Sequence, residues 1–256
     1  MSDTHLRSLN LLEYMLANPE VQSPSALASA LGVARATIYR MLDDLIRAGW
    51  LLPGDRSRPY RPSLRLAALG LGVLRDDYRR EVMFRNAAQL AGRGSGPVLI
   101  SFLEGAEVVY TDTIEVFGES VTSALNGTRM PAACSAPGKA MLATLPEAVL
   151  APIVAQGCPP LTSRTRTTPY QIRQEIELTR ERGYGFADGE YHEDFAGVAM
   201  AVFDRSGSAV GAMSIGRTRP VGFEGYPQNV LEDLRFYTEK ASAELGYLGS
   251  RGAGLA

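Results

Sequence analysis

One stretch decides the fold of the N-terminal part: Ser23–Gly49, with the sequence SPSALASALGVARATIYRMLDDLIRAG. Ser23 suits a helix N-cap and Pro24 the first turn that follows. Gly32 stands where this short helix must end, because glycine adopts positive φ without steric cost. A second helix is predicted from about residue 34 to residue 48. Its apolar residues follow helical spacing: Ile38, Met41, Leu42, Leu45 and Ile46. Two helices joined by a tight glycine turn are typical of a helix-turn-helix.

The polar side of the second helix predicts DNA contacts. The N-terminal end of this helix enters the major groove in the motif, where arginine suits guanine edges or phosphate and hydroxyls suit phosphate. We therefore predict that Arg35, Thr37, Tyr39 and Arg40 of this helix bind DNA. Ser25 of the first helix and Arg56 and Arg58 after the second helix complete the predicted DNA-binding set. A small helical bundle that binds another protein, or nothing, is the alternative.

The residues after the second helix favour DNA binding. Trp50–Leu52 is predicted to be a strand, residues 53–57 a polar turn, and Arg58–Arg61 a returning strand. A hairpin with arginines at its tip is a wing. Residues 34–61 hold six arginines and three aspartates, whereas the whole chain has a net charge of −2. This local positive charge suits a phosphate-facing surface.

Bulk properties narrow the class of protein. The 256 residues suffice for two ordinary domains, and no apolar stretch reaches the length needed to cross a bilayer. Glu13 and Asn18 interrupt any apolar run of the kind found in a signal peptide. Cys134 and Cys158 have no CxxC spacing. A cytoplasmic protein with reduced thiols and no membrane partner is expected.

Downstream of the wing the pattern changes twice. Residues 63–92 are predicted to be mainly helical and to serve as a linker. The rest predicts apolar strands in pairs at residues 97–103 and 107–114 and at residues 198–203 and 209–215, with helices at 170–182 and at the C-terminus. Paired antiparallel strands with interspersed helices indicate an α+β fold.

At this point the chain resembles the IclR family of transcriptional regulators. Leu9–Glu13, Ala36–Leu42 and Leu45–Gly49 are similar to its winged helix-turn-helix, and Met130–Ala143 and Arg180–Glu190 are similar to its effector domain. The resemblance implies a DNA-binding domain (1–62), a linker helix (63–92), a GAF/PAS-like effector-binding domain with an antiparallel sheet (93–249), and a tail (250–256). It also implies a regulator, more often a repressor, and no enzyme and no cofactor.

The sequence departs from the family pattern at three places. Tyr191–Ala196 looks like a small insertion. Pro137 stands where other members can offer a backbone N–H to the ligand, and Gly216 stands where some members have a second serine. Both changes make the site less polar, which favours a somewhat larger organic acid or an aromatic metabolite over the smallest oxoacids.

The effector pocket is predicted between the helix that begins at Ser135 and the strands that follow. The N–H groups of Gly138 and Lys139 are expected to receive a carboxylate at the helix start. Met130, Val198 and Met200 are expected to be apolar walls, and Asp188 and Ser214 polar anchors. The complete predicted effector set is Met130, Cys134, Ser135, Ala136, Pro137, Gly138, Asp188, Val198, Met200 and Ser214. The alternative is that these residues are only core.

An enzyme is the rival hypothesis. Asp188, Glu190 and His192 alternate along a strand and could share a face, as a metal-dependent or hydrolytic site requires. A solvated acidic loop is the simpler interpretation. A wing and a linker helix would have no role in such an enzyme.

Self-association is the last expectation. A single recognition helix reads only a few base pairs, so a two-fold dimer on a pseudo-palindromic operator in double-stranded DNA is expected. The leucines of residues 64–74 have little polar cover, and they predict a helix that packs on a copy of itself. The resemblance implies a homodimer or a homotetramer.

Overall fold

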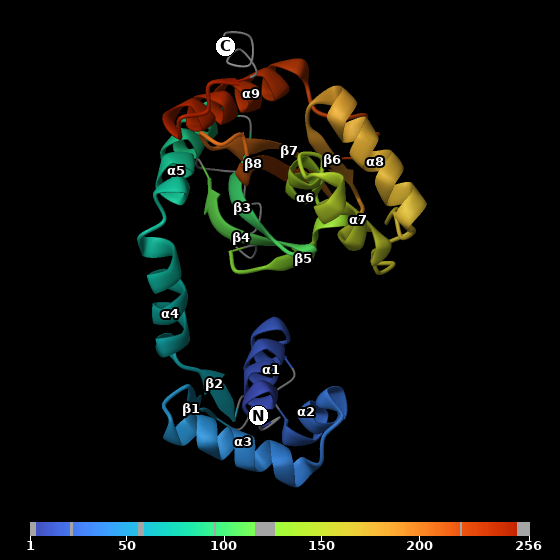
Figure 1. The fold of residues 1–256 in the computed structure, drawn as a ribbon. Helices are drawn as coiled ribbons and strands as arrows, with labels where there is room; N and C mark the ends of the chain where they lie inside the picture. The colour runs from blue at the N-terminus through green and yellow to red at the C-terminus, as the bar shows by residue number, and fades with distance from the viewer. Residues whose placement is uncertain are drawn as a thin grey trace. The chain divides into compact units, whose positions relative to one another are not determined.

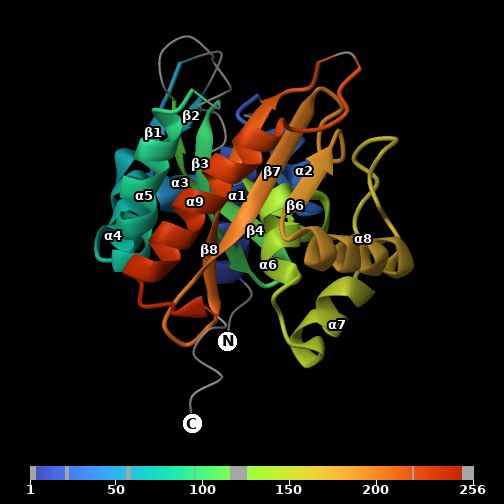
Figure 2. The ribbon, with the colours of Figure 1, turned by 90° about the horizontal axis from the view of Figure 1, so that it is seen from above.

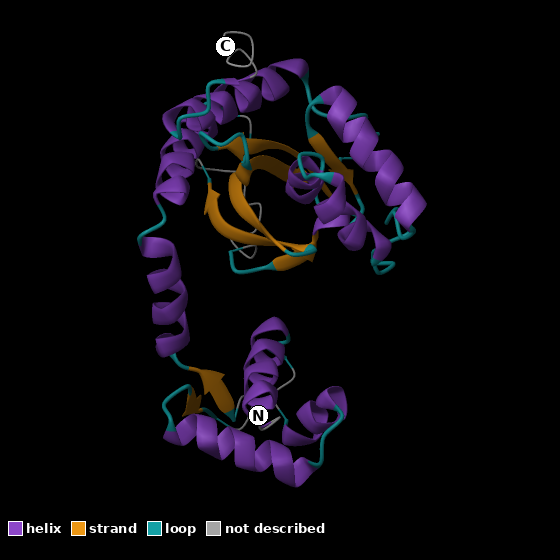
Figure 3. Ribbon diagram, viewed as in Figure 1, coloured by secondary structure: helices purple, strands orange, loops and turns teal. Residues whose placement is uncertain are grey.

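The computed structural model describes residues 4–20, 23–55, 59–94, 96–115, 126–220 and 222–249. It forms two compact units, Met1–Asp77 and Tyr78–Ala256. Figures 1 and 3 show their helices and strands. No described helix is both long enough and apolar enough to span a bilayer.

The N-terminal unit is a winged helix-turn-helix. Its elements are α1 (Thr4–Ala17), α2 (Pro24–Leu31), α3 (Arg35–Arg47), β1 (Leu51–Pro53), β2 (Tyr60–Pro62) and α4 (Leu64–Arg75). The oxygen of Ser23 accepts a hydrogen bond from the N–H of Ala26, and Gly32 ends α2 at φ 64°. The core includes Leu11, Leu27 and Ile38, which are fully buried. The helix-turn-helix predicted from the sequence is confirmed.

The segment 63–92 forms two helices where a single linker helix is expected. The helix α4 ends at Arg75, and α5 (Tyr78–Ala91) begins after Asp76 and Asp77. The two helices have opposite environments: α4 buries no residue, whereas α5 buries Val82, Met83 and Leu90 completely. The helix α5 is therefore part of the C-terminal unit and covers its sheet.

The C-terminal unit is an α+β domain around one curled antiparallel sheet (Figure 2). Its strands are β3 (Val98–Glu104), β4 (Glu107–Ile114), β5 (Arg129–Pro131), β6 (Gly185–Asp188), β7 (Phe195–Phe203) and β8 (Ala209–Thr218). Their spatial order is β5-β4-β3-β8-β7-β6. The helices are η2 (Ala132–Cys134), α6 (Ala136–Leu142), α7 (Glu147–Ala155), α8 (Pro169–Arg182) and α9 (Gln228–Glu244). The α+β class predicted from the paired strands is confirmed.

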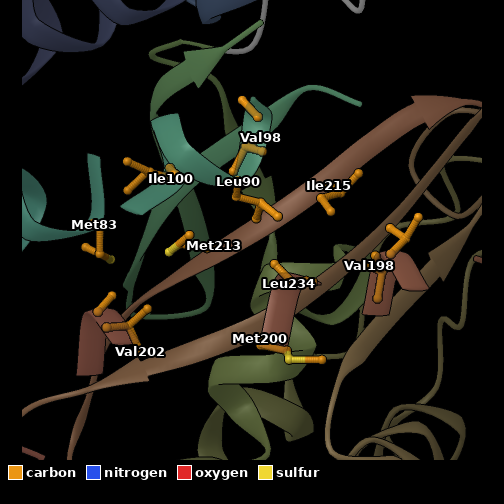
Figure 4. Close-up of a cluster of buried hydrophobic side chains, with 14 of the residues drawn as sticks. Met83, Leu90, Val98, Ile100, Val198, Met200, Val202, Met213, Ile215 and Leu234 are labelled. Atoms are coloured by element: carbon orange, nitrogen blue, oxygen red, sulfur yellow. The ribbon is translucent and has the colours of Figure 1, made fainter. Parts of the chain in front are cut away.

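Helices cover both faces of this sheet. On one face, α5 and α9 bury an apolar cluster that includes Met83, Leu90 and Leu234 against β3, β7 and β8 (Figure 4). The other face packs on η2 and α6, with α7 and α8 beyond them. Because side chains alternate along a strand, consecutive residues of β7 belong to different cores.

The helix α6 approaches the sheet very closely. A Cβ atom on Gly138 would overlap the carbonyl oxygen of Ala132, and one on Gly185 would overlap that of Ala136. Ala136 and Ala140 of α6 pack on Ala199 of β7. These small residues let α6 lie against β6 and β7, and this position fixes one wall of the site described next.

Candidate functional site

The helix α3 presents a polar face at its N-terminal end. Ile38 and Leu42 are buried, whereas Arg35, Tyr39 and Arg40 are exposed and Thr37 is half-buried. The guanidinium of Arg35 lies 5.9 Å from the centre of the Tyr39 ring. Among the described residues, neither Arg35 nor Arg40 has a carboxylate within 4.0 Å. Both guanidinium groups can therefore turn toward an external anion.

The N-termini of α2 and α3 differ in capping, and the difference favours anion binding at the N-terminal end of α3. Ser23 caps α2, but no side chain caps α3. Uncapped N–H groups at the positive end of a helix dipole favour phosphate. Ser25 is exposed in the first turn of α2. Arg56 and Arg58 lie outside the described residues, so their predicted contacts have no structural counterpart here.

The wing is attached to the helices by Arg65. Strands β1 and β2 pair in antiparallel register from Leu51 opposite Pro62 to Pro53 opposite Tyr60. Arg65 donates a 2.6 Å hydrogen bond to the carbonyl of Ala48, and its guanidinium lies 4.2 Å from the centre of the Trp50 ring. The base of the hairpin is thus fixed against the end of α3.

A small cavity lies in the C-terminal unit between α6 and the sheet. Its volume is about 20 Å³, room for about one water molecule. Its lining includes Leu99, Tyr110, Met130, Cys134, Ser135, Ala136, Pro137, Ala187, Glu190, Tyr191, Phe195, Gly197, Ser214, Ile215 and Gly216. Six residues of the predicted effector set line it: Met130, Cys134, Ser135, Ala136, Pro137 and Ser214.

Four predicted effector residues lie elsewhere. Val198 and Met200 belong to the core under α5 and α9, on the opposite face of β7 (Figure 4). Gly138 packs on the backbone of Ala132. Asp188 forms ion pairs with Arg219 and with Arg164, the latter at 3.0 Å. Strand alternation removes Val198 and Met200 from the cavity wall, and ion pairs remove Asp188. Close packing on Ala132 removes Gly138.

The N–H groups at the start of α6 that were predicted to bind a carboxylate already donate hydrogen bonds within the protein. Ser135 Oγ accepts the N–H of Gly138 at 3.1 Å, and the carbonyl of Ser135 accepts the N–H of Lys139 at 3.0 Å. Pro137 has no N–H. The N–H groups of Gly138 and Lys139 are therefore not free to bind an acidic ligand. Burial raises the pKa of the Tyr110 hydroxyl, so this group remains a proton donor.

Phe195 and Gly216 form a pair that the sequence did not indicate. A Cβ atom on Gly216 would lie 2.6 Å from Cζ of Phe195, so the aromatic ring occupies the space above this glycine. Phe195 and Tyr191 both come from the short insertion expected at residues 191–196. The usable signal was the alternation of β7, which puts Phe195 on the same face as Gly197.

Beside the cavity lies a buried group of charges that sequence reasoning also missed. Lys139 is 1% exposed, and its Nζ lies 2.5 Å from Glu190 and 3.6 Å from Glu175. Arg166 contacts both carboxylates, at 2.7 Å and 2.9 Å, and Arg182 contacts Glu175 at 2.7 Å. Burial lowers the pKa of Lys139, and the two glutamates oppose that shift. We call these five residues the charged cluster.

The rival metal site does not form. Asp188 pairs with arginines, Glu190 belongs to the charged cluster, and His192 is exposed, with its Nδ1 accepting the N–H of Asp194. Within the described ranges no three histidine, cysteine or acidic residues gather as metal ligands would. Cys134 is a buried thiol whose pKa is raised by a hydrogen bond with Cys158 and by burial, as expected of a structural cysteine.

Comparison with known proteins matches both units to one family of regulators. The family described as IclR helix-turn-helix domain matches residues 6–53, and the bacterial transcriptional regulator IclR C-terminal family matches residues 81–243. The chain is 28% identical over 214 residues to the probable transcriptional regulator SauR of Cupriavidus necator, covering 82% of this chain and 84% of that protein. It is 23% identical to the transcriptional repressor IclR of Escherichia coli, over 82% and 77% of the two chains.

Solved structures share the fold. An IclR homologue from Microbacterium hydrocarbonoxydans, crystallised with 4-hydroxybenzoate, superimposes with a TM-score of 0.75 at 21% identity. The superposition covers 95% of this chain and 99% of that one.

Proposed function

The chain belongs to the IclR family of DNA-binding transcriptional regulators, and we propose that it is a repressor whose affinity for its operator changes when a small aromatic acid enters the α6 cavity. The observation that carries this proposal is the cavity itself. Three aromatic residues, Tyr110, Tyr191 and Phe195, line it together with Ser135 and Ser214. Such a lining suits a ring with one or two polar substituents.

An effector of this size needs more room than 20 Å³. Phe195 is the side chain whose movement would make it, because it is only partly buried and stands at the start of β7. Its position above Gly216 means that an entering ring would take the space that Phe195 leaves. Effector binding would then move the first residue of β7, which pairs with β6 and β8.

The proposal is tested by sequencing the DNA fragments that the purified protein retains from a random pool. A pseudo-palindromic site is expected, and 4-hydroxybenzoate is expected to change its affinity in a band-shift titration. Retained fragments without two-fold symmetry would contradict the dimeric reading of the operator. An affinity that no aromatic acid alters would contradict the proposed effector class.

Replacing Ser214 by alanine is expected to weaken binding of an aromatic acid about three- to tenfold, because one neutral hydrogen bond is worth about 1 kcal/mol. Ser214 lies on the cavity wall and is 3% exposed. Isothermal titration with 4-hydroxybenzoate measures the change. Ser206→Ala, in an exposed turn, is the matched control. Equal affinities in the two variants would remove Ser214 from the site.

We also propose that two chains pair through α4. This helix leaves four large apolar side chains exposed: Leu64 (85%), Leu69 (58%), Leu71 (65%) and Val73 (79%). Covering them with a second copy removes apolar area from water, and it gives the two-fold symmetry that a pseudo-palindromic operator needs. The same pairing can form within a dimer or within a tetramer.

The double variant Leu69→Glu/Val73→Glu is expected to dissociate this pairing and to halve the molar mass measured by light scattering. Charged side chains would be buried in an apolar contact at a cost that a dimer interface does not tolerate. Leu178→Glu on α8, also an exposed leucine, is the control. A variant with the wild-type mass would place the dimer interface elsewhere.

A further inference from the structure

The two oxygens of the Glu190 carboxylate have unequal surroundings. Oε1 accepts from Lys139 Nζ at 2.5 Å and from an Arg166 nitrogen at 2.7 Å. Oε2 is buried and has no hydrogen-bond partner among the described residues. Glu190 itself is 2% exposed and lines the α6 cavity. The charged cluster therefore leaves one carboxylate oxygen without a donor on a residue that lines the cavity.

In Glu175, the other glutamate of the charged cluster, both carboxylate oxygens have a partner. Glu175 Oε1 pairs with Arg182 at 2.7 Å, and Glu175 Oε2 pairs with Arg166 at 2.9 Å. Lys139 Nζ also donates a hydrogen bond to the carbonyl of Phe186 at 2.8 Å. A buried carboxylate oxygen without a donor is costly, and most buried polar atoms are hydrogen-bonded. A hydrogen-bond donor on a bound ligand would give Glu190 Oε2 the partner that it lacks.

The charges decide what kind of donor fits. Three cations of the cluster face two carboxylates, so an added ammonium group would meet excess positive charge. A ligand carboxylate beside Oε2 would meet a like charge. A neutral hydroxyl avoids both penalties and can donate directly. Because Tyr110, Tyr191 and Phe195 line the same cavity, the hydroxyl best carried there is phenolic.

We propose that Glu190 Oε2 accepts a hydrogen bond from a phenolic hydroxyl of the effector, so that the protein senses hydroxylated aromatic acids in preference to unhydroxylated ones. This rests on the proposed function, because it concerns the same cavity. It adds a specificity-determining residue. In this proposal the acid group of the ligand is bound away from Glu190, by Ser135 and Ser214 of the same lining.

The test compares two probes of nearly the same shape, 4-hydroxybenzoate and 4-methylbenzoate, by isothermal titration of the full-length protein. The wild type is expected to bind the hydroxylated probe about tenfold or more tightly, since the methyl analogue leaves the buried acceptor unpaired. In Glu190→Met the acceptor is removed and no donor takes its place, so the preference is expected to disappear. The readout is the ratio of two affinities within one variant, which a change in stability alone does not move.

Glu175→Met is the matched control, because it removes the same charge from the same cluster at a residue outside the cavity lining. It is expected to keep the wild-type ratio. Equal affinities of the two probes for the wild type would overturn the role of Glu190 and leave the proposed effector class standing, and this comparison needs no variant to fold. A ratio lost equally in both variants would also overturn it. Binding of neither probe would overturn the proposed effector class and this assignment together.

Discussion

The double variant Arg35→Ala/Arg40→Ala is expected to lose operator affinity by about a hundredfold or more. Each arginine that contacts a base is worth about 1–3 kcal/mol, and each phosphate contact adds to the salt dependence of binding. Both residues are exposed at the uncapped start of α3, and no described carboxylate holds either of them. Fluorescence anisotropy with the selected operator, repeated at several salt concentrations, measures both effects.

A matched control separates recognition from net charge. Arg173→Ala removes a positive charge from α8, where this arginine pairs with Glu147 at 2.9 Å. It is expected to bind the operator like the wild type. If the double variant kept wild-type affinity and the same salt dependence, the contact surface assigned to α3 would be excluded.

The variant Lys139→Met is expected to destabilise the C-terminal unit by about 3–5 kcal/mol, because removing one partner leaves a buried carboxylate uncompensated. Methionine has similar length, so the change is mainly one of charge. Glu190 and Glu175 would keep only the two arginines, of which Arg166 is 38% exposed. Urea unfolding followed by circular dichroism gives the change in free energy of unfolding.

Two further variants make this result interpretable. Lys240→Met changes the chain's only other lysine, which bonds Gln89 on the surface, and is expected to cost little. Lys139→Met/Glu190→Gln removes one charge of each sign and is expected to recover part of the loss. A single variant as stable as the wild type would show that the arginines alone hold both glutamates.

The N-terminal unit could be predicted well because its information is local. Ser23, Gly32 and the stripe of Ile38, Met41, Leu42 and Leu45 each determine structure within a few residues, and all have their expected places. The part of the cavity wall formed by residues 130–137 was predictable for the same reason, since one continuous segment builds it.

The rest of the cavity wall depends on information that the sequence does not carry locally. The strand β7 is buried on both faces, so an apolar run cannot tell whether Val198 or Ala199 faces α6. Lys139 and Glu190 lie 51 positions apart. The pairing of Asp188 with Arg219 likewise joins two strand ends that are distant in sequence. Such long-range ion pairs decided which polar residues line the cavity.

The position of α5 changes what can be exchanged between regulators of this kind. Val82, Met83 and Leu90 contribute directly to the apolar layer over β3, β7 and β8, although they precede β3, the first strand of the C-terminal unit. A chimaera joined at residue 93 would separate these side chains from the strands they cover. A C-terminal unit transferred to another regulator should therefore start at Tyr78. The junction between the two units of the chain is the pair Asp76 and Asp77.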